Sequence, residues 1–246
     1  MKEYCNTRTY SLRYSDFDFK DELTPTALLA LTQESACMSA DELGFGYDDL
    51  RPKHYGFIIV NTYCEFTRPV RLGESITVET WPLPPRHVIF ERDYRVKAGE
   101  EQVAALASRW CLVDLESFAL LTPDKLQDVH TRCPYRAEKT VEVPSWKIPR
   151  IANGREVYRM QVHFSHCDHY MHANNTRYAD FFMDCFTMEE LAARPVKSFQ
   201  IAYCKQAKEG KELVLYREDF GEYSICEAVS DGELLTQFRI TFGEGK

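Results

Sequence analysis

Polar and apolar residues alternate along most of the chain, in short runs interrupted by proline, glycine and charged residues. Such runs predict β-strands, especially where β-branched and aromatic residues gather. In the N-terminal half the predicted strands are 5–14, 57–68, 75–81, 88–97 and 102–114. In the C-terminal half they are 157–164, 199–205, 212–217, 223–230 and 234–242. Each half therefore has one leading strand and a group of four that follows.

Two segments have the periodicity of a helix. The first begins at Thr24 and Pro25, which suit an N-cap and a first helical position, and ends at Gly44. The second begins near Asn175, and its apolar residues are spaced by three and four positions. These residues are Tyr178, Phe181, Phe182, Cys185 and Met188. We therefore expect a long helix after the leading strand of each half.

The two halves repeat one order of elements: strand, polar loop, helix, four strands. A shift of 150 positions brings Asp18 onto Asp168, and each lies in the loop that precedes a helix. An internal repeat of this kind indicates a duplicated fold. We predict two copies of one α+β unit, an N-terminal domain over 1–121 and a C-terminal domain over 153–246.

A predicted linker, 122–152, joins the two copies. Prolines interrupt any long helix or strand in it (Pro123, Pro134, Pro144, Pro149). Between 131 and 159 the basic residues outnumber the acidic ones; they are Arg132, Arg136, Lys139, Lys147, Arg150, Arg155 and Arg159. In a chain of net charge −8 this excess is a candidate docking patch for an anionic partner. Solvated linker charges are the commoner arrangement for any single residue.

Composition narrows the class of protein. Of 246 residues, 44% are hydrophobic and 28% charged, as in globular domains, and no apolar run has the length of a membrane span or signal peptide. The nine cysteines are scattered without a C-x-x-C pair, which indicates reduced thiols and a cytoplasmic location. The negative net charge argues against nucleic acid as the main partner.

The segment S-H-C-D-H-Y-M-H-A-N-N-T-R-Y (165–178) carries the most chemistry. Its ionisable residues are Asp168, His166, His169 and His172, and two candidate caps, Asn174 and Asn175, follow them. A carboxylate and an imidazole beside a helix start, which can polarise a carbonyl oxygen, could form a hydrolytic site. Histidines three apart in an extended segment point in different directions, so we expect no metal. An Asp before a helix is more often a turn or cap residue than a catalytic one.

These motifs resemble those of the acyl-acyl carrier protein thioesterases of plants and bacteria, over essentially the whole chain. In the C-terminal half the pattern is D-x-x-x-H-x-N-N-x-x-Y, formed by Asp168, His172, Asn174, Asn175 and Tyr178. In the N-terminal half the shared stretches are L-T-Q-E-S-A (31–36), F-T-R-P-V-R-L-G-E (66–74) and R-W-C-L-V-D (109–114). The resemblance implies an α+β tandem hot-dog fold, in which two antiparallel sheets each wrap around a long central helix.

The chain departs from the family pattern at three positions. The family's loop reads Asp-x-Asn-x-His, and Tyr170 stands in place of the Asn. Beyond the aromatic residue that corresponds to Tyr203, the family usually has a Glu and often a Cys, where this chain has Gln206 and Ala207. Asp168 and His172 therefore carry over directly as catalytic residues. Tyr170 and Gln206 become candidates for orienting a water.

The resemblance implies hydrolysis of fatty acyl-acyl carrier protein to free fatty acid, a reaction of lipid metabolism, with no cofactor. Asp168 would act as general base on a water or attack the thioester carbon directly, and His172 would hydrogen-bond the water or the departing thiol. Backbone N–H groups near Asn174 and Asn175 would bind the carbonyl oxygen. No G-x-S-x-G elbow supports a serine hydrolase. The loop around Asp18 lacks the matching residues, so we expect one working site, with the N-terminal half shaping the acyl tunnel.

Two alternatives remain at this point. One is an acyl-CoA thioesterase on the same fold, and the other is a non-catalytic protein that binds acyl thioesters. A dehydratase on this fold is less favoured. The expected partner is acidic acyl carrier protein, with neither nucleic acid nor membrane. Because one chain already supplies two hot-dog units, a monomer and a homodimer both fit.

Overall fold

The computed structural model describes residues 4–128 and 134–244. In the N-terminal half the strands are β1 (Asn6–Ser11), β2 (Tyr55–Phe66), β3 (Ser75–Pro82), β4 (Ile89–Ala98), β5 (Glu101–Asp114) and β6 (Leu120–Leu121). The helices there are α1 (Pro25–Glu42) and α2 (Tyr47–Leu50), with 3-10 turns η1 (Tyr14–Asp16), η2 (Arg51–Lys53) and η3 (Pro123–Asp128). None of the described helices is long and apolar enough to cross a membrane.

The C-terminal half repeats this order. Its strands are β7 (Arg155–Gln161), β8 (Val196–Tyr203), β9 (Glu212–Asp219), β10 (Tyr223–Ser230) and β11 (Glu233–Phe242). Its helices are α3 (Arg177–Met183) and α4 (Met188–Ala193), with a 3-10 turn η4 (Phe164–His166). Each strand predicted from the sequence is present, with ends shifted by a few residues.

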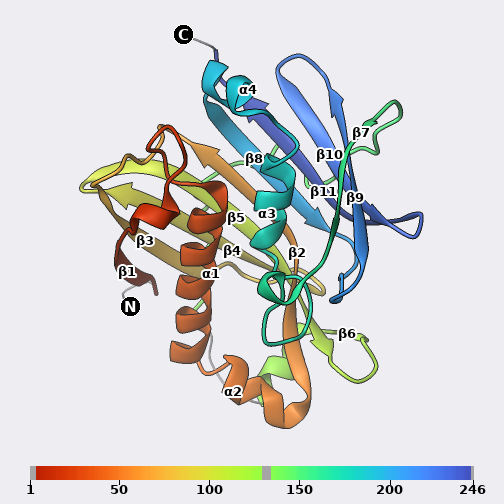
Figure 1. Cartoon of the computed structure of the whole chain (residues 1–246). Helices are drawn as coiled ribbons and strands as arrows, with labels where there is room; N and C mark the ends of the chain where they lie inside the picture. The colour runs from red at the N-terminus through yellow and green to blue at the C-terminus, as the bar shows by residue number, and fades with distance from the viewer. Residues whose placement is uncertain (1–3, 129–133, 245–246) are drawn as a thin grey trace.

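The strands form one antiparallel sheet, in the order β1-β3-β4-β5-β2-β8-β11-β10-β9-β7, with β6 paired to β5. The central strands β2 and β8 join the two halves, from the pair Asn61 and Ala202 to the pair Glu65 and Ser198. Helices α1 and α3 lie side by side against one face of the sheet (Figure 1). The predicted α+β tandem hot-dog fold is therefore confirmed, with its two sheets joined edge to edge.

Helix α1 begins and ends as its sequence predicts. The Thr24 hydroxyl oxygen accepts from the Ala27 N–H (3.1 Å), and Pro25 occupies the first turn. Gly44 has φ of +76°, which lets the chain reverse just after the helix. The face that α1 buries is mixed, because Thr32 and Ser39 are buried beside leucines and an alanine.

The second helix is shorter than predicted. It begins at Arg177, because the Asn174 side-chain oxygen accepts from the N–H of Thr176 (3.0 Å) and closes a turn there. It breaks before α4, where Thr187 and Glu190 form a capping box: the Glu190 N–H donates to the Thr187 hydroxyl (3.2 Å) and the Thr187 N–H to the Glu190 carboxylate (2.7 Å). Met188, expected to be buried, is 61% exposed. The expectation of one long amphipathic helix here is wrong.

The linker crosses the sheet on the face opposite α1. Tyr94 and Asp93 are neighbours on β4, so their side chains point to opposite faces. Tyr94 lies beneath α1, whereas the Asp93 carboxylate accepts hydrogen bonds from the N–H (2.5 Å) and hydroxyl (3.1 Å) of Thr140. The Trp81 indole N–H likewise donates to the Glu138 carbonyl (2.9 Å). These bonds fasten the linker to β3 and β4.

Three of the seven basic residues between 131 and 159 are balanced within the chain. Arg136 pairs with Glu138, and the other pairs are Arg150 with Glu227 (2.8 Å) and Arg159 with Glu156 (2.7 Å). Arg132 lies outside the described residues. Over the described ranges, Lys139, Lys147 and Arg155 have no ion pair and are exposed. The predicted docking patch is thus reduced to these three cations.

Candidate active site

The loop that carries Asp168 folds as a tight turn. The Asp168 N–H donates to the His172 carbonyl (3.0 Å), and the Met171 N–H donates to the Asp168 carbonyl (2.9 Å). Oδ1 of Asp168 accepts from the Tyr170 N–H (2.9 Å), as in an Asx turn. Asp168 is half-buried, and its Oδ2 has no hydrogen bond to any described residue. One carboxylate oxygen therefore remains available to a bound molecule.

The corresponding loop of the N-terminal half binds its carboxylate more completely. Oδ1 of Asp18 accepts from the N–H groups of Lys20 (2.8 Å) and Glu22 (3.1 Å). The Lys20 ammonium lies 3.9 Å from Oδ2 of Asp18 and 2.7 Å from the Glu22 carboxylate. The Asp18 charge is therefore compensated within its own loop, whereas Asp168 has no ion pair with a described residue.

His172 and Gln206 lie on neighbouring segments. His172 forms an antiparallel bridge with Lys208, which places the loop beside the chain that follows β8. The imidazole is half-buried, and its Nδ1 has no hydrogen-bond partner in the described part of the chain. Gln206 is exposed, and no hydrogen bond joins its side chain to Asp168 or His172 there. The structure brings the three residues into one region without a direct bond between their side chains.

Tyr170 packs against other rings. Its ring centroid lies 4.0 Å from that of His169 and 6.0 Å from that of Tyr47 on α2. Tyr47 also meets His169 edge-on at 5.5 Å. Burial raises the pKa of Tyr170, so its hydroxyl stays protonated at neutral pH. These contacts brace the loop against the N-terminal half.

The other loop histidines have separate surroundings. Nδ1 of His166 accepts from the His163 N–H (3.0 Å), and burial lowers the pKa of His166. His169 lies among the tyrosines described above. Within 4–128 and 134–244, no group of three histidine, cysteine or carboxylate side chains is arranged to hold a metal ion.

Ala207 supports the loop from behind. It is 1% exposed, and its carbonyl accepts from the Ala173 N–H (2.8 Å). Tyr178 lies close to the Ala207 backbone, and burial raises the pKa of Tyr178 to about 12. A methyl side chain in this position offers no nucleophile.

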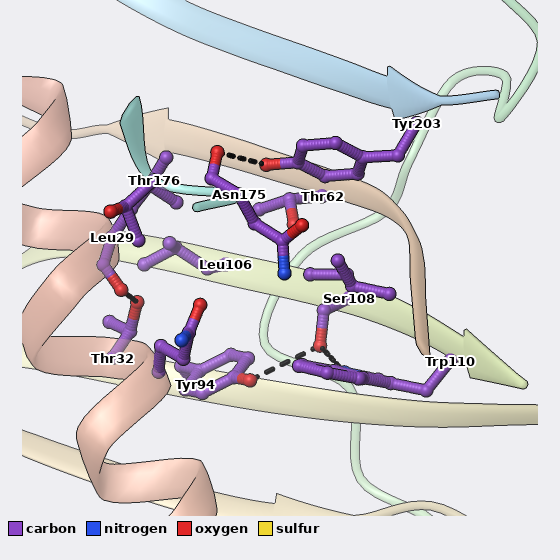
Figure 2. Close-up of a pocket in the computed structure, with 12 residues that line it drawn as sticks. Leu29, Thr32, Thr62, Tyr94, Leu106, Ser108, Trp110, Asn175, Thr176 and Tyr203 are labelled. Atoms are coloured by element: carbon purple, nitrogen blue, oxygen red, sulfur yellow. Dashed lines mark hydrogen bonds between the residues drawn. The ribbon is translucent and has the colours of Figure 1, made fainter. Parts of the chain in front are cut away.

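A narrow pocket, partly open to solvent, lies between α1, the sheet and the start of α3 (Figure 2). Asn175 lines it, and Figure 2 shows this side chain pointing into the space. The Asn175 carbonyl accepts from the Tyr203 hydroxyl (3.1 Å), which holds this turn against β8. Asn174 does not line the pocket, because its side chain closes the turn at Thr176. The described residues that line the pocket do not include Asp168, Tyr170, His172 or Gln206.

Several residues on the pocket wall were not among those singled out from the sequence. Leu106, Ser108 and Trp110 follow one another on one face of β5, and Tyr94 lies on β4. Nε1 of Trp110 donates to the Ser108 hydroxyl (2.7 Å), and the Tyr94 and Ser108 hydroxyls are 3.2 Å apart. The sequence shows Ser108 on the inward face of an otherwise apolar strand, but it does not show that Tyr94 lies beside it.

Burial also affects the tyrosines on the wall. It raises the pKa of Tyr94 and that of Tyr203, so both remain neutral hydrogen-bond donors. Thr62 is 3% exposed, and its hydroxyl makes no regular hydrogen bond with a described residue, although it lies near the Tyr203 hydroxyl. The pocket thus combines aliphatic walls with a few buried hydroxyl groups.

Comparison with known proteins covers nearly the whole chain. The family model described as Acyl-ACP thioesterase N-terminal domain matches residues 3–122, and that described as Acyl-ACP thioesterase C-terminal domain matches residues 152–246. Among solved structures, an acyl-ACP thioesterase from Bacteroides thetaiotaomicron is similar with a TM-score of 0.88 at 20% identity, over 97% of this chain and 98% of that one. The 12:0-ACP thioesterase from Umbellularia californica gives a TM-score of 0.88 at 16% identity, over 97% of each chain. No curated protein matches the chain.

Proposed function

Because the chain belongs to the acyl-ACP thioesterase family and is a thioester hydrolase, we propose that it releases free fatty acid from acyl-acyl carrier protein, with Asp168 as the base or nucleophile. One observation carries the proposal. The turn that directs Asn175 into the pocket continues from the loop that holds the free carboxylate oxygen of Asp168. A thioester bound with its acyl chain in the pocket would therefore have its carbonyl group beside this loop.

The carbonyl oxygen needs a hydrogen-bond donor as negative charge develops on it. Helix α3 has seven residues, and the Thr176 N–H is already bonded to Asn174, so the helix start contributes little. The side-chain amide of Asn175 points into the pocket and makes no hydrogen bond with a described residue. In our proposal Asn175 binds the carbonyl oxygen, and Asn174 supports it by fixing the turn.

The proposed reaction balances with water as the second substrate. The water oxygen bonds to the thioester carbon while Asp168 takes the water proton. The C–S bond then breaks, and the proton passes to the departing sulfur with His172 as its hydrogen-bond partner. In the alternative route Asp168 attacks the carbon itself, the C–S bond breaks and the sulfur leaves as a thiol after taking a proton from solvent, and water then hydrolyses the resulting anhydride to the free acid and Asp168. Gln206 and the Tyr170 hydroxyl have supporting roles in this proposal, because neither is bonded to Asp168.

The experiment that tests this function is release of free thiol from matched acyl thioesters of acyl carrier protein and of coenzyme A. The wild-type chain should hydrolyse both, with a higher kcat/KM for the carrier protein substrate. The Asp168→Asn variant should lose turnover and still bind the substrate. Equal kcat/KM for both carriers would favour an acyl-CoA thioesterase, and absence of thiol release from either would exclude the proposal.

A further inference from the structure

The pocket wall contains more polar groups than an unsubstituted alkyl chain requires. We propose that it selects an acyl group that carries a hydroxyl or keto oxygen within the first few carbons from the thioester. This inference rests on the proposed function for the position of the thioester. It adds the chemical class of the acyl chain, which neither the fold nor the family establishes.

The first set of polar groups lies on the sheet. Ser108 and Tyr94 are 2% and 3% exposed, yet both line the pocket. The Ser108 hydroxyl accepts from the Trp110 indole N–H (2.7 Å) and lies 3.2 Å from the Tyr94 hydroxyl and 3.5 Å from the Arg92 carbonyl. A hydroxyl has one hydrogen and two lone pairs, so these contacts use the full capacity of Ser108. The Tyr94 hydroxyl therefore donates its hydrogen to Ser108 and can still accept a further bond.

The second set faces the first. Figure 2 shows the Asn175 amide pointing into the pocket between Thr62 and Ser108, and the amide makes no hydrogen bond with a described residue. Thr62 is nearly fully buried, and its hydroxyl also lacks a regular hydrogen bond over those residues. Polar groups from the loop and from two strands therefore converge on one short stretch of the pocket.

The chemistry of these groups distinguishes two classes of acyl chain. A plain alkyl chain would exclude water and leave the Thr62 hydroxyl and the second lone pair of the Tyr94 hydroxyl unused, which costs free energy. A hydroxyl on the chain could donate to the Tyr94 oxygen, and a hydroxyl or keto oxygen on the chain could accept from the Thr62 hydroxyl. A site built to hydrogen-bond a substrate group rejects the analogue that lacks that group. The aliphatic side chains of Leu29 and Leu106 contact the remaining carbons.

The stated position of the oxygen follows from Asn175. In the proposed function this residue binds the thioester carbonyl, and the Tyr94 and Ser108 hydroxyls lie across the same pocket from it (Figure 2). Only a few carbons therefore separate the carbonyl from the hydroxyl groups.

The test compares 3-hydroxyacyl, 3-oxoacyl and unsubstituted acyl thioesters of one chain length on one carrier. We expect kcat/KM to be about tenfold higher for at least one oxygenated chain, the effect of one hydrogen bond of about 1.4 kcal/mol. In Tyr94→Phe this preference should fall to about twofold or less, again because one hydrogen bond is removed. The control is Tyr63→Phe, since Tyr63 is also buried and donates to Glu65 away from the pocket, and it should keep the preference.

A binding measurement separates this inference from the proposed function. Calorimetry on the free acids of the same three chains reports on the pocket whether or not hydrolysis occurs. Tighter binding of an oxygenated acid, lost in Tyr94→Phe and kept in Tyr63→Phe, supports the inference even if no thioester is cleaved. Equal or tighter binding of the unsubstituted acid overturns it, even if the chain proves to be an active thioesterase.

Discussion

Asp18 and Asp168 occupy the same position in two loops 150 residues apart and share two hydrogen bonds. In each, Oδ1 accepts from the N–H two residues later, at 2.8 Å in Asp18 and 2.9 Å in Asp168. The backbone N–H of each also donates to the carbonyl four residues later, at 2.8 and 3.0 Å. The turn alone therefore does not distinguish a catalytic carboxylate from a structural one. The difference lies in the additional hydrogen bond from the Glu22 N–H and in the Lys20 ammonium near Asp18, neither of which has a counterpart at Asp168.

Substituting each aspartate by asparagine tests this difference. Asparagine keeps the Oδ1 acceptor and therefore the turn, but it removes the charge. We expect Asp168→Asn to lower kcat by at least about 100-fold, the usual contribution of a general base, and Asp18→Asn to change it by less than about threefold. Thiol release gives the rates, and thermal unfolding shows whether both variants remain folded. Equal losses of activity in two folded variants would contradict a single site.

The Tyr170 ring, rather than its hydroxyl, should matter for activity. The ring packs on His169 and Tyr47, and no hydrogen bond from the hydroxyl to another described residue is found. We expect Tyr170→Phe to keep kcat/KM within about twofold, because aromatic packing is retained. Tyr170→Ala should lower it about tenfold, because small displacements of a catalytic group are costly.

Tyr47→Ala provides an independent check on that reading. This substitution removes the Tyr47 ring, which packs on Tyr170 from helix α2 outside the loop. It should reproduce part of the fall in kcat/KM expected for Tyr170→Ala. If Tyr170→Phe were as damaging as Tyr170→Ala, the hydroxyl would have to act on the substrate or the water directly.

Asp93 should make stability depend on pH between about 4 and about 6. Burial raises the pKa of Asp93, and this effect outweighs the opposite effect of the hydrogen bonds from Thr140. The pKa rises from 3.8 to about 6. The folded state therefore binds a proton more tightly than the unfolded state, and stability from this group is lost as pH rises from about 4 to about 6. The ionised form costs about 3 kcal/mol above that range.

The Asp93→Asn variant keeps an acceptor for Thr140 and should be more stable than the wild type at pH 8. The gain should shrink as pH falls toward 4, as measured by denaturant unfolding across this range. Asp114→Asn is the matched control with the opposite sign, because hydrogen bonds from Ser117 lower the pKa of Asp114. A gain for Asp93→Asn that did not change with pH would contradict the titration.

The strands and α1 could be predicted because their signals are local. Alternation marks each strand, and Thr24, Pro25 and Gly44 mark the ends of α1. The second helix could not be read from periodicity, since the apolar spacing continues across the break before α4. The sequence signal for that break is the capping box formed by Thr187 and Glu190.

The candidate site also has one part with a local signal in the sequence and another part without one. Asp168, His172 and Asn175 were found together because they lie in one loop of the sequence. Tyr94 and Ser108 become neighbours only through the pairing of β4 with β5, in which Tyr94 lies opposite Leu106. Strand register is set by packing across the whole sheet, so no short motif could indicate this pocket wall.

The three unpaired linker cations should affect binding of the carrier protein and leave the rate of thioester hydrolysis unchanged. Lys139, Lys147 and Arg155 are exposed and lack ion pairs with described residues, so they can attract an acidic protein. The triple charge reversal to Glu should raise KM for acyl-acyl carrier protein several-fold, in a manner that added salt weakens. The same variant should hydrolyse acyl-pantetheine at the wild-type rate, because this small substrate makes no contact with the linker. Lys197→Glu, a reversal of an exposed charge on β8, is the control. An unchanged KM for the carrier protein substrate in the triple variant would place docking on another surface.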